Sequence, residues 1–369
     1  MPQKILVLVS GYPSQSNLYN CSWAHTRNRY YIEQGLSLDV YVPDVGVSYE
    51  IDGVNVISKE QFNINLKTKA YTLIISHSPN IRKHLPIMKN LQEIKKILFM
   101  HGTESMSLNN DYPKPYRYME TGLIKSLLRD CYDHLKFKAL KKFILKNKNN
   151  INMVFVSDWM KDIFCKNIFL LDKTDVKYSI IHNSLNNNFI ERNFINDMVE
   201  PVADFVTLRS LDLSKYAIDM VVNLAIANPK YSFHIYGKGN YFSHNERPEN
   251  VTVFNYHIPQ DEICDLLSKY RCALMPTRCD AQGVMACEIA TYGMPMVTTD
   301  ISINRDMFSS FKNVKLLTET EFNNPINIEL LSENISISKN EKFSKVNTLN
   351  KEIALILSTL STEKKEIFK

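Results

Sequence analysis

Short runs of aliphatic and β-branched residues, each bounded by turn residues, alternate with stretches of helical periodicity along most of the chain. Strands that alternate with helices predict parallel sheets wound by right-handed crossovers. The runs cover residues 5–9, 38–42, 73–76, 97–100, 153–156, 178–181, 204–208, 232–236, 251–254, 272–275 and 296–299. Because the pattern occurs once before and once after about residue 185, we expect an α/β chain with two doubly wound, Rossmann-like domains.

The same pattern predicts the domain boundaries. We expect an N-terminal domain over residues 1–185, a connecting linker over 186–203, a C-terminal domain over 204–340 and a final helix over 341–369. The linker is rich in asparagine and has no sustained period. The final helix has apolar positions at helical intervals and is expected to cross back to the N-terminal domain. Ligands of such sheets bind outside the carboxyl ends of the strands, so we expect a site in a cleft between the domains.

Composition excludes several classes of protein. Only 10 of the 369 residues are glycine, which excludes collagen-like and linker-rich chains, and 44% hydrophobic residues exclude global disorder. The formal net charge of +5 is small for this length and gives no reason to expect a nucleic-acid partner. The N-terminal apolar run is too short for a signal peptide or a membrane span, so we expect a cytoplasmic protein. Seven scattered cysteines predict neither disulfides nor a zinc site.

One helical region, residues 121–150, differs from the rest in charge. It carries a net charge of +6, and its apolar residues recur close to helical spacing. A basic amphipathic helix can lie on an anionic membrane surface, which would make the protein peripheral at the inner face of the membrane. A helix packed on the core with a solvated basic face explains the same pattern equally well.

The stretch 276–300 is the most specific in the chain. Asp280 lies in a loop that leaves a predicted strand, and Glu288 lies in the helix that follows. Side chains of a helix tilt toward its N-terminus, so Glu288 can reach the same pocket as Asp280. Gly283 between them allows backbone N–H groups to approach a ligand closely. Two acceptors and exposed N–H donors suit a phosphorylated, polyhydroxylated ligand.

This stretch resembles the signature of the retaining glycosyltransferases of family 4, the glycosyl transferases group 1 of bacterial surface-polysaccharide type. The resemblance implies the GT-B fold, in which Glu288 binds the ribose of a nucleotide sugar. The first acidic position of the family is glutamate, whereas this chain has Asp280, which the resemblance places at the donor sugar. Backbone N–H groups at Gln282, Gly283 and Val284 are implied to assist there.

A second pair of residues, Arg209 and Lys215, follows the first predicted strand of the C-terminal half. The family has an arginine and a lysine at this spacing, and both bind the donor diphosphate. A guanidinium and an ammonium can stabilise a departing nucleoside diphosphate without a metal ion. The chain has no Asp-x-Asp motif, so we expect no metal and no other cofactor.

Loops after other predicted strands complete the expected site. Gly237 and Gly239 match the glycine turn that the family places beside the nucleotide, and a phenylalanine at 242 disfavours a dinucleotide fingerprint. Gly11 follows the first strand and matches the family's N-terminal nucleotide loop, and His101 matches a residue near the donor sugar. Three further residues are candidates for contact with the acceptor: Glu104, His25 and Arg27.

The resemblance implies transfer of a sugar, with retention of configuration, from a nucleotide-diphosphate sugar, with UDP expected as the nucleotide. The expected acceptor is a glycan, lipid-linked, in the biosynthesis of a bacterial surface polysaccharide such as O-antigen, lipopolysaccharide or capsule. Two alternatives stay open, because a fold does not fix a function. One is a sugar-nucleotide epimerase on the same scaffold, and the other is a non-catalytic subunit that binds a sugar nucleotide.

Overall fold

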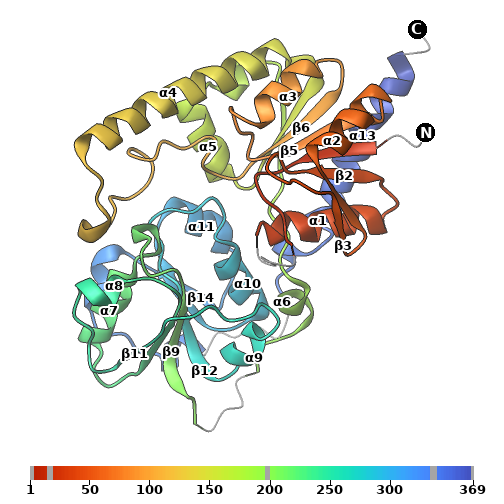
Figure 1. Ribbon diagram of the computed structural model, residues 1–369. Helices are drawn as coiled ribbons and strands as arrows, with labels where there is room; N and C mark the ends of the chain where they lie inside the picture. The colour runs from red at the N-terminus through yellow and green to blue at the C-terminus, as the bar shows by residue number, and fades with distance from the viewer. Residues whose placement is uncertain (1–3, 15–19, 196–199, 333–338, 367–369) are drawn as a thin grey trace. The chain divides into compact units, whose positions relative to one another are not determined.

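The computed structural model describes residues 4–14, 20–195, 200–332 and 339–366, and the chain divides into two compact units. The first unit comes from described residues within Met1–Ser107, Asp130–Ser184 and Lys345–Lys369. The second comes from those within Leu108–Arg129 and Leu185–Ser344. Each unit contains one predominantly parallel sheet (Figure 1). The prediction of an α/β chain with two doubly wound sheets is therefore confirmed.

The sheet of the first unit has the strand order β3-β4-β2-β1-β5-β6-β7-β8. All neighbours are parallel except β3 and β4, which form a hairpin. The strands are β1 (Lys4–Leu8), β2 (Leu38–Tyr41), β3 (Tyr49–Ile51), β4 (Val54–Ile57), β5 (Tyr71–His77), β6 (Lys95–Met100), β7 (Ile151–Phe155) and β8 (Lys177–Ile180). The helices are α1 (Ser22–Glu33), α2 (Lys59–Lys67), α3 (His84–Asn90), α4 (Leu123–Lys146), α5 (Asp158–Asn167) and α13 (Leu349–Glu366). The part of α4 up to Arg129 is assigned to the second unit.

The core of the first unit lies between its central strands and the helices α1 and α13. Val7, Leu73 and Phe99 from the sheet pack with Tyr31 of α1 and Ile356 of α13 in one buried cluster. The final helix thus belongs to the first unit, although it follows the second unit in sequence. Burial of large aliphatic and aromatic side chains is the main stabilising term for such a layer.

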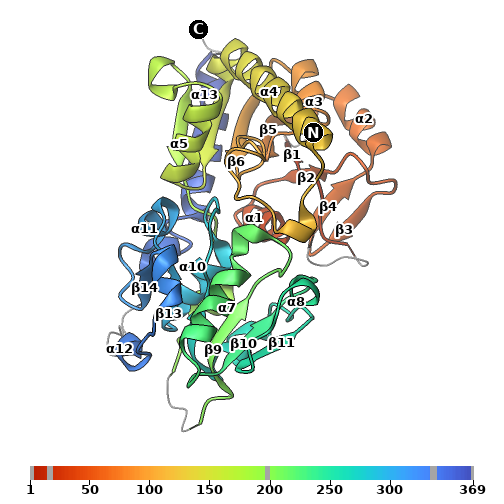
Figure 2. The same ribbon diagram turned by 90° about the vertical axis from the view of Figure 1, so that its left-hand side faces the viewer.

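The sheet of the second unit is parallel throughout, with the order β11-β10-β9-β12-β13-β14 (Figure 2). The strands are β9 (Ala203–Leu208), β10 (Phe233–Tyr236), β11 (Val251–Phe254), β12 (Tyr270–Leu274), β13 (Met296–Thr299) and β14 (Val314–Leu317). The helices are α6 (Asn187–Glu191), α7 (Ile218–Ala227), α8 (Tyr241–His244), α9 (Ile263–Leu267), α10 (Val284–Tyr292), α11 (Ser302–Phe308) and α12 (Glu329–Ser332). Phe205, Val221 and Phe322 lie in its core.

Residues 108–129 lie with the second unit, although the sequence placed them in a domain over 1–185. Tyr116 donates a hydrogen bond to Asp219, and Tyr118 donates one to Asp212, at 2.9 Å each. The ring of Tyr118 also stacks on His244, with 4.3 Å between ring centres. These polar and aromatic contacts correct the predicted boundary.

The predicted linker over 186–203 is also corrected in part. Phe189 in α6 is fully buried, and the backbone N–H of Phe194 donates to the carbonyl of Tyr292 at 2.7 Å. Its described residues before 196 are therefore packed on the second unit, because two phenylalanines anchor them there. Residues 196–199 of this linker, like 367–369 of the predicted final helix, lie outside the described residues.

Candidate active site

The carboxyl ends of three adjacent strands bring the predicted donor-side residues together in the second unit. Arg209 follows β9, Gly237 follows β10, and Asp280 lies in the loop that follows β12. Because β10, β9 and β12 are neighbours and parallel, these loops leave the same edge of the sheet. The strand order runs in opposite directions on the two sides of β9, and such a switch point is where doubly wound sheets bind ligands.

Arg209 is a buried cation at this edge, with 8% of its surface exposed. Its guanidinium carbon lies 4.9 Å from the ring centre of Tyr216, and Nη2 donates to the carbonyl of Met275 at 3.4 Å. Nε is buried and has no partner among the described residues. Burial lowers the pKa of Arg209, but an arginine remains charged at neutral pH. A buried donor without an acceptor fits a site that an anion completes.

Lys215 lies in a 3-10 turn, Ser214–Tyr216, and supplies a second cation. Its Nζ lies 4.5 Å from the ring centre of Tyr216, the ring that Arg209 also contacts. Burial alone would lower the pKa of Lys215, but the neighbouring Tyr216 and Asp280 raise it above its usual value. Lys215 is therefore charged at neutral pH, beside Arg209.

Backbone contacts fix the turn that carries Lys215. The carbonyl of Lys215 accepts hydrogen bonds from the N–H of Arg278 at 2.8 Å and from Oγ1 of Thr277 at 2.9 Å. These donors lie directly before Asp280 in the loop after β12. Hydrogen bonds thus join the loop that carries Lys215 to the loop that carries Asp280.

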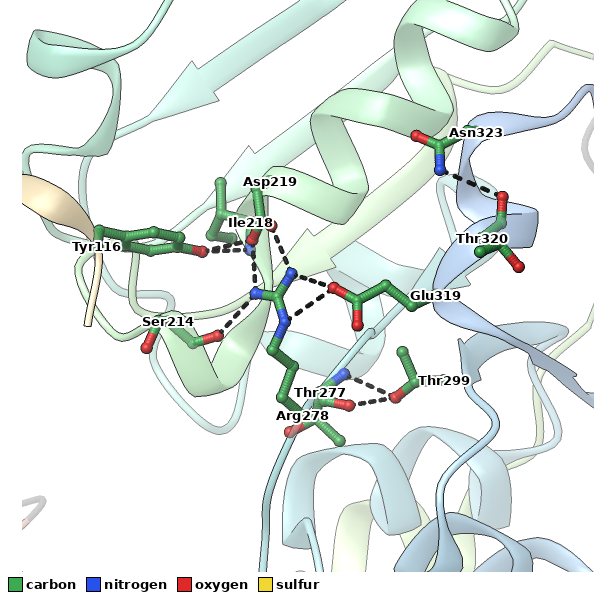
Figure 3. Close-up of polar contacts among 10 residues, drawn as sticks. All are labelled: Tyr116, Ser214, Ile218, Asp219, Thr277, Arg278, Thr299, Glu319, Thr320 and Asn323. Carbon is green, nitrogen blue, oxygen red and sulfur yellow. Dashed lines mark hydrogen bonds and ion pairs between the residues drawn. The ribbon is translucent and has the colours of Figure 1, made fainter. Parts of the chain in front are cut away.

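The Arg278 side chain strengthens this connection between the two loops (Figure 3). Its Nη1 and Nη2 donate to the two carboxylate oxygens of Asp219 in α7, at 2.8 and 2.5 Å. Nη2 also donates to Glu319 at 2.7 Å, and Nη1 donates to the carbonyl of Ser214 at 3.2 Å. Tyr116 donates to the same Asp219. The sequence analysis did not single out Arg278, although it lies two residues before Asp280 in the signature stretch.

The turn Gly237–Gly239 packs directly against the loop that carries Arg209. The N–H of Arg209 donates to the carbonyl of Tyr236, and the N–H of Leu211 donates to that of Lys238, at 3.0 Å each. A Cβ at Gly237 would lie 1.7 Å from the carbonyl oxygen of Arg209. This contact excludes any side chain, so the glycine turn sets the path of the backbone at Arg209.

The signature stretch forms a tight turn into α10. The Asp280 carboxylate accepts a hydrogen bond from the N–H of Ala281 at 2.8 Å. Gly283 has φ +70°, a left-handed conformation that favours glycine, and it caps α10. A Cβ there would come within 3.8 Å of Asp280 Oδ2. Gln282 is buried, and Val284 is the first residue of α10. The N–H groups of the first helical turn point out of the N-terminal end of α10.

Glu288 is buried in α10, with 2% of its surface exposed. Its Oε1 accepts a hydrogen bond from the backbone N–H of Asn186 at 3.0 Å. Burial raises the pKa of Glu288 to about 7, and the bond from Asn186 opposes this shift. A buried carboxyl near the midpoint of its titration is typical of functional sites.

In the first unit, His101 lies in an aromatic cluster after β6. Its Nε2 is 3.0 Å from Nδ1 of His77, and its ring centre is 4.4 Å from that of Trp23. Burial, and then the charge of Arg27, hold the pKa of His101 well below its usual value. The imidazole is therefore neutral at pH 7. His77, at the end of β5, was not predicted as a partner of His101.

Glu104 is buried in the loop that follows β6. Its Oε1 accepts hydrogen bonds from the backbone N–H groups of His101 and Gly102, and only 4% of the residue is exposed. Its carboxylate therefore orders the loop that carries His101. The predicted contact with an acceptor stays a prediction.

Arg27 is also a structural residue. It is fully buried, and its Nε donates to Glu352 of α13 at 3.0 Å while Nη2 donates to Asn183 at 2.7 Å. The predicted acceptor contact fails, because the guanidinium is used inside the core. Both ring nitrogens of His25 likewise have partners, Tyr12 at 3.0 Å and Asp52 at 2.9 Å.

Gly11 lies in the loop after β1, at the sheet edge where the first unit has its own switch point between β1 and β5. A Cβ at this position would lie 2.5 Å from the side chain of Asn20. A shift of this exposed side chain would make room for a Cβ, so packing alone does not require glycine here. Its expected contact with a nucleotide stays a prediction.

Known proteins resemble this chain in one sequence region and in the whole fold. Residues 204–364 match the family model described as Glycosyl transferases group 1. No curated protein sequence matches the chain significantly.

Solved structures with 10–12% sequence identity share the fold. Sucrose-phosphate synthase of Thermosynechococcus elongatus has a TM-score of 0.68 at 10% identity, over 99% of this chain and 100% of that chain. HepE of Anabaena, solved with UDP and glucose, has a TM-score of 0.62 at 12% identity, over 96% and 99%. WaaG, a glycosyltransferase involved in lipopolysaccharide biosynthesis, has 0.55 at 12% identity, over 89% of each. Residues 204–364 therefore form a glycosyl transferases group 1 domain, and the whole chain shares the GT-B fold of these glycosyltransferase structures.

Proposed function

We propose that the chain transfers a sugar from UDP-sugar to a glycan acceptor with retention of anomeric configuration. The observation that carries this proposal is the pair of cations, the buried Arg209 and the half-buried Lys215, at the same sheet edge as Asp280. Transfer from a nucleotide sugar expels a nucleoside diphosphate, on which negative charge develops. Two positive groups held in place before the reaction stabilise that charge.

The other residues of the second unit take roles around this pair. Glu288 accepts hydrogen bonds from the ribose hydroxyls. Asp280 binds hydroxyls of the donor sugar, together with backbone N–H groups near the start of α10. The residues proposed for the donor are Arg209, Lys215, Gly237, Gly239, Asp280, Gln282, Gly283, Val284 and Glu288. From the first unit we include Gly11 and His101.

The proposed reaction needs no protein nucleophile. The bond between the anomeric carbon and the diphosphate oxygen breaks first, and an oxocarbenium-like centre forms. The acceptor hydroxyl attacks the same face and gives its proton to the departing diphosphate. Arg209 and Lys215 supply the positive charge, so the proposal includes no metal ion and no other cofactor.

Two neighbours support the choice of substrates. The HepE structure contains UDP and glucose, and WaaG acts in lipopolysaccharide biosynthesis. We therefore propose UDP as the nucleotide and a lipid-linked glycan of a bacterial surface polysaccharide, such as O-antigen or capsule, as the acceptor. In this proposal the enzyme works in the cytoplasm, peripheral to the inner face of the membrane.

A thermal-shift panel of UDP-, GDP- and ADP-sugars tests the donor. A ligand at 100 times its Kd adds about 2.7 kcal/mol to the free energy of unfolding, which corresponds to a shift of several degrees. We expect the UDP-sugars to give the largest shift. Arg209→Ala should abolish it, whereas Arg271→Ala, at the opposite end of β12, should retain it. No shift with any sugar nucleotide, or a shift that Arg209→Ala leaves unchanged, would contradict the proposal.

A further inference from the structure

Helix α4 presents an apolar surface to solvent on the side opposite to the one that packs on the protein. Its buried residues are Asp133, Lys136, Leu140, Phe143 and Ile144. At ~100° per residue these side chains fall on one sector of the helix, and a second set of apolar residues falls on the opposite sector. That second set is Leu123 (84% exposed), Ile124 (76%), Leu127 (65%), Leu128 (65%) and Leu135 (62%).

The apolar residues of α4 thus lie on two opposite sides of the helix, and this corrects the sequence-based expectation of one continuous apolar stripe. Only the apolar residues in the second half of α4 reach the core, because the first half turns its leucines outward. Burial of apolar surface contributes roughly 25 cal/mol per Å², so five large exposed side chains on one sector favour an apolar partner.

The same outward sector becomes basic in the second half of α4. Lys138, Lys141, Lys142 and Lys146 lie on it and are exposed. The outward face therefore has an apolar end followed by a cationic end. At ~1.5 Å per residue, Lys142 lies only about 10 Å along the helix from Leu135.

A pocket of about 320 Å³ lies at the cationic end, between α3 and α4. Three lysines line it, Lys89, Lys142 and Lys146, together with the apolar side chains Ala139 and Phe143. Among the described residues that line the pocket there is no aspartate or glutamate. Three lysines and no acidic residue at this hollow favour an anionic group, such as a phosphate, beside them.

We propose that α4 docks the protein on an anionic lipid bilayer, with its apolar half in the interface and a lipid headgroup phosphate in the pocket between α3 and α4. An interfacial helix of this kind buries its apolar face at the level of the headgroups, while its lysines attract anionic lipids. The helix does not cross the bilayer, because none of the described helices is long and apolar enough to do so.

This inference rests on the membrane placement in the proposed function and names the surface responsible. Its test does not use activity, so the inference and the proposed glycosyl transfer can fail separately. The full chain is sedimented with vesicles of phosphatidylcholine alone and of phosphatidylcholine with one quarter phosphatidylglycerol. We expect binding to the anionic vesicles only, and weakening of that binding by salt. Absence of binding to the anionic vesicles, or equal binding to both, would overturn the proposal.

Three double variants locate the surface. Leu127→Glu/Leu128→Glu and Lys142→Glu/Lys146→Glu should each weaken partitioning roughly tenfold or more, since each lysine near the surface contributes several-fold. Lys59→Glu/Lys67→Glu on α2 makes the same change in net charge at exposed positions and should stay within about twofold of the wild type. The altered side chains are exposed, and unchanged melting temperatures would show that the variants fold.

Two further outcomes distinguish a lipid bilayer from other binding partners of the α4 surface. If the pocket variant loses binding of inorganic phosphate but keeps vesicle binding, the pocket serves a free anion and the proposal fails. If the wild type is a dimer that Leu127→Glu/Leu128→Glu makes monomeric, and vesicles do not bind, the apolar surface serves self-association and the proposal also fails.

Discussion

The side chains of Arg209 and Lys215 both lie against the ring of Tyr216. This contact explains how two cations can lie close together at this site. Tyr216 lies 4.9 Å from the Arg209 guanidinium carbon and 4.5 Å from Lys215 Nζ, so its π-face stabilises both charges. Asp280 adds a nearby negative charge. The pair is thus charged and in position before the substrate arrives.

We expect Arg209→Ala and Lys215→Ala each to lower kcat by about 10²–10³, because each removes one group that stabilises charge in the transition state. KM for the donor should rise as well, because both groups also bind the diphosphate of the donor before the reaction. Steady-state kinetics with a UDP-sugar measure both. Arg271→Ala is the matched control, because its partners Asp204 and Glu329 are 3.5–3.7 Å away at the other end of the strand. Near-normal kcat in both alanine variants would remove the pair from the mechanism.

Glu288 gives the donor site a dependence on pH. Its pKa of about 7, raised by burial, lies above the usual value for glutamate, so the carboxyl becomes protonated as the pH falls through 7. The charged form accepts hydrogen bonds from ribose hydroxyls more strongly. We expect the Kd for a UDP-sugar to rise roughly tenfold from pH 8 to pH 6, in proportion to the loss of the carboxylate.

Calorimetric titration of a UDP-sugar at the two pH values measures this effect, because the diphosphate diester itself keeps its charge over that range. Glu288→Gln should bind more weakly at pH 8 and show little further change at pH 6. A wild-type Kd that is equal at pH 6 and pH 8 would rule out the role of Glu288 as a charged acceptor.

At the scale of elements, the loops after β9 and β12 act as one unit because Arg278 joins them. It holds Asp219 at the start of α7, Glu319 and the carbonyl of Ser214 (Figure 3). The hydrogen bonds that Arg278 donates to Asp219 and to Glu319 raise the pKa of Arg278 above its usual value. Arg278 is therefore a positioning residue for Lys215.

Replacement Arg278→Met should lower the free energy of unfolding by roughly 2 kcal/mol, because Asp219 loses its charged partner. It should also lower kcat, since the turn that carries Lys215 becomes loose. Arg278→Lys should restore part of the stability but less of kcat, because an ammonium cannot make the bidentate contact. Denaturant unfolding and kinetics are both needed. Arg305→Met, an exposed arginine paired with Asp300, serves as the control and should change neither.

Most strands could be predicted from the sequence, because their cores are continuous apolar runs. The short strands β3 (Tyr49–Ile51), β4 (Val54–Ile57) and β14 (Val314–Leu317) were missed. The β3–β4 hairpin turns at Asp52 and Gly53, both with positive φ, so the turn interrupts the apolar pattern between its two strands. Asp280, Gly283 and Glu288 could be placed at one site, because their spacing after a strand fixes them on one turn and one helix.

Burial could not be predicted for charged residues whose partners lie far away in the sequence. Arg27 was expected to contact an acceptor, yet it is fully buried and its partner Glu352 comes 325 residues later. In the same way, nothing in the local pattern shows that Tyr116 and Tyr118 bond to Asp219 and Asp212, about a hundred residues further along. Contacts of this kind depend on the whole fold.

At the scale of the whole molecule, the Arg27–Glu352 pair joins the two ends of the chain within the first unit. Both side chains are fully buried, and Tyr31 also donates to Glu352. Glu352→Gln should lower the free energy of unfolding by about 3–5 kcal/mol, because it leaves Arg27 as an uncompensated buried charge. Denaturant unfolding, followed by the fluorescence of the chain's two tryptophans, measures the change.

The control for this prediction is Arg29→Met on the same helix, whose partner Asp52 is 3.6 Å away and half exposed. This substitution should lower the free energy of unfolding by less than about 1 kcal/mol. The double variant Arg27→Met/Glu352→Leu should recover part of the lost stability, since apolar replacement of a buried pair is often tolerated. Equal stability of Glu352→Gln and the wild type would contradict the structural role.

The identity and anomeric configuration of the product test the central claim most directly. The purified protein is incubated with a UDP-sugar and a glycan acceptor, and NMR follows UDP, the sugar nucleotide and the product together. We predict equal amounts of UDP and of a glycosylated product whose new linkage keeps the configuration of the donor. An epimerised sugar nucleotide without release of UDP, an inverted linkage, or no reaction at all would contradict the account.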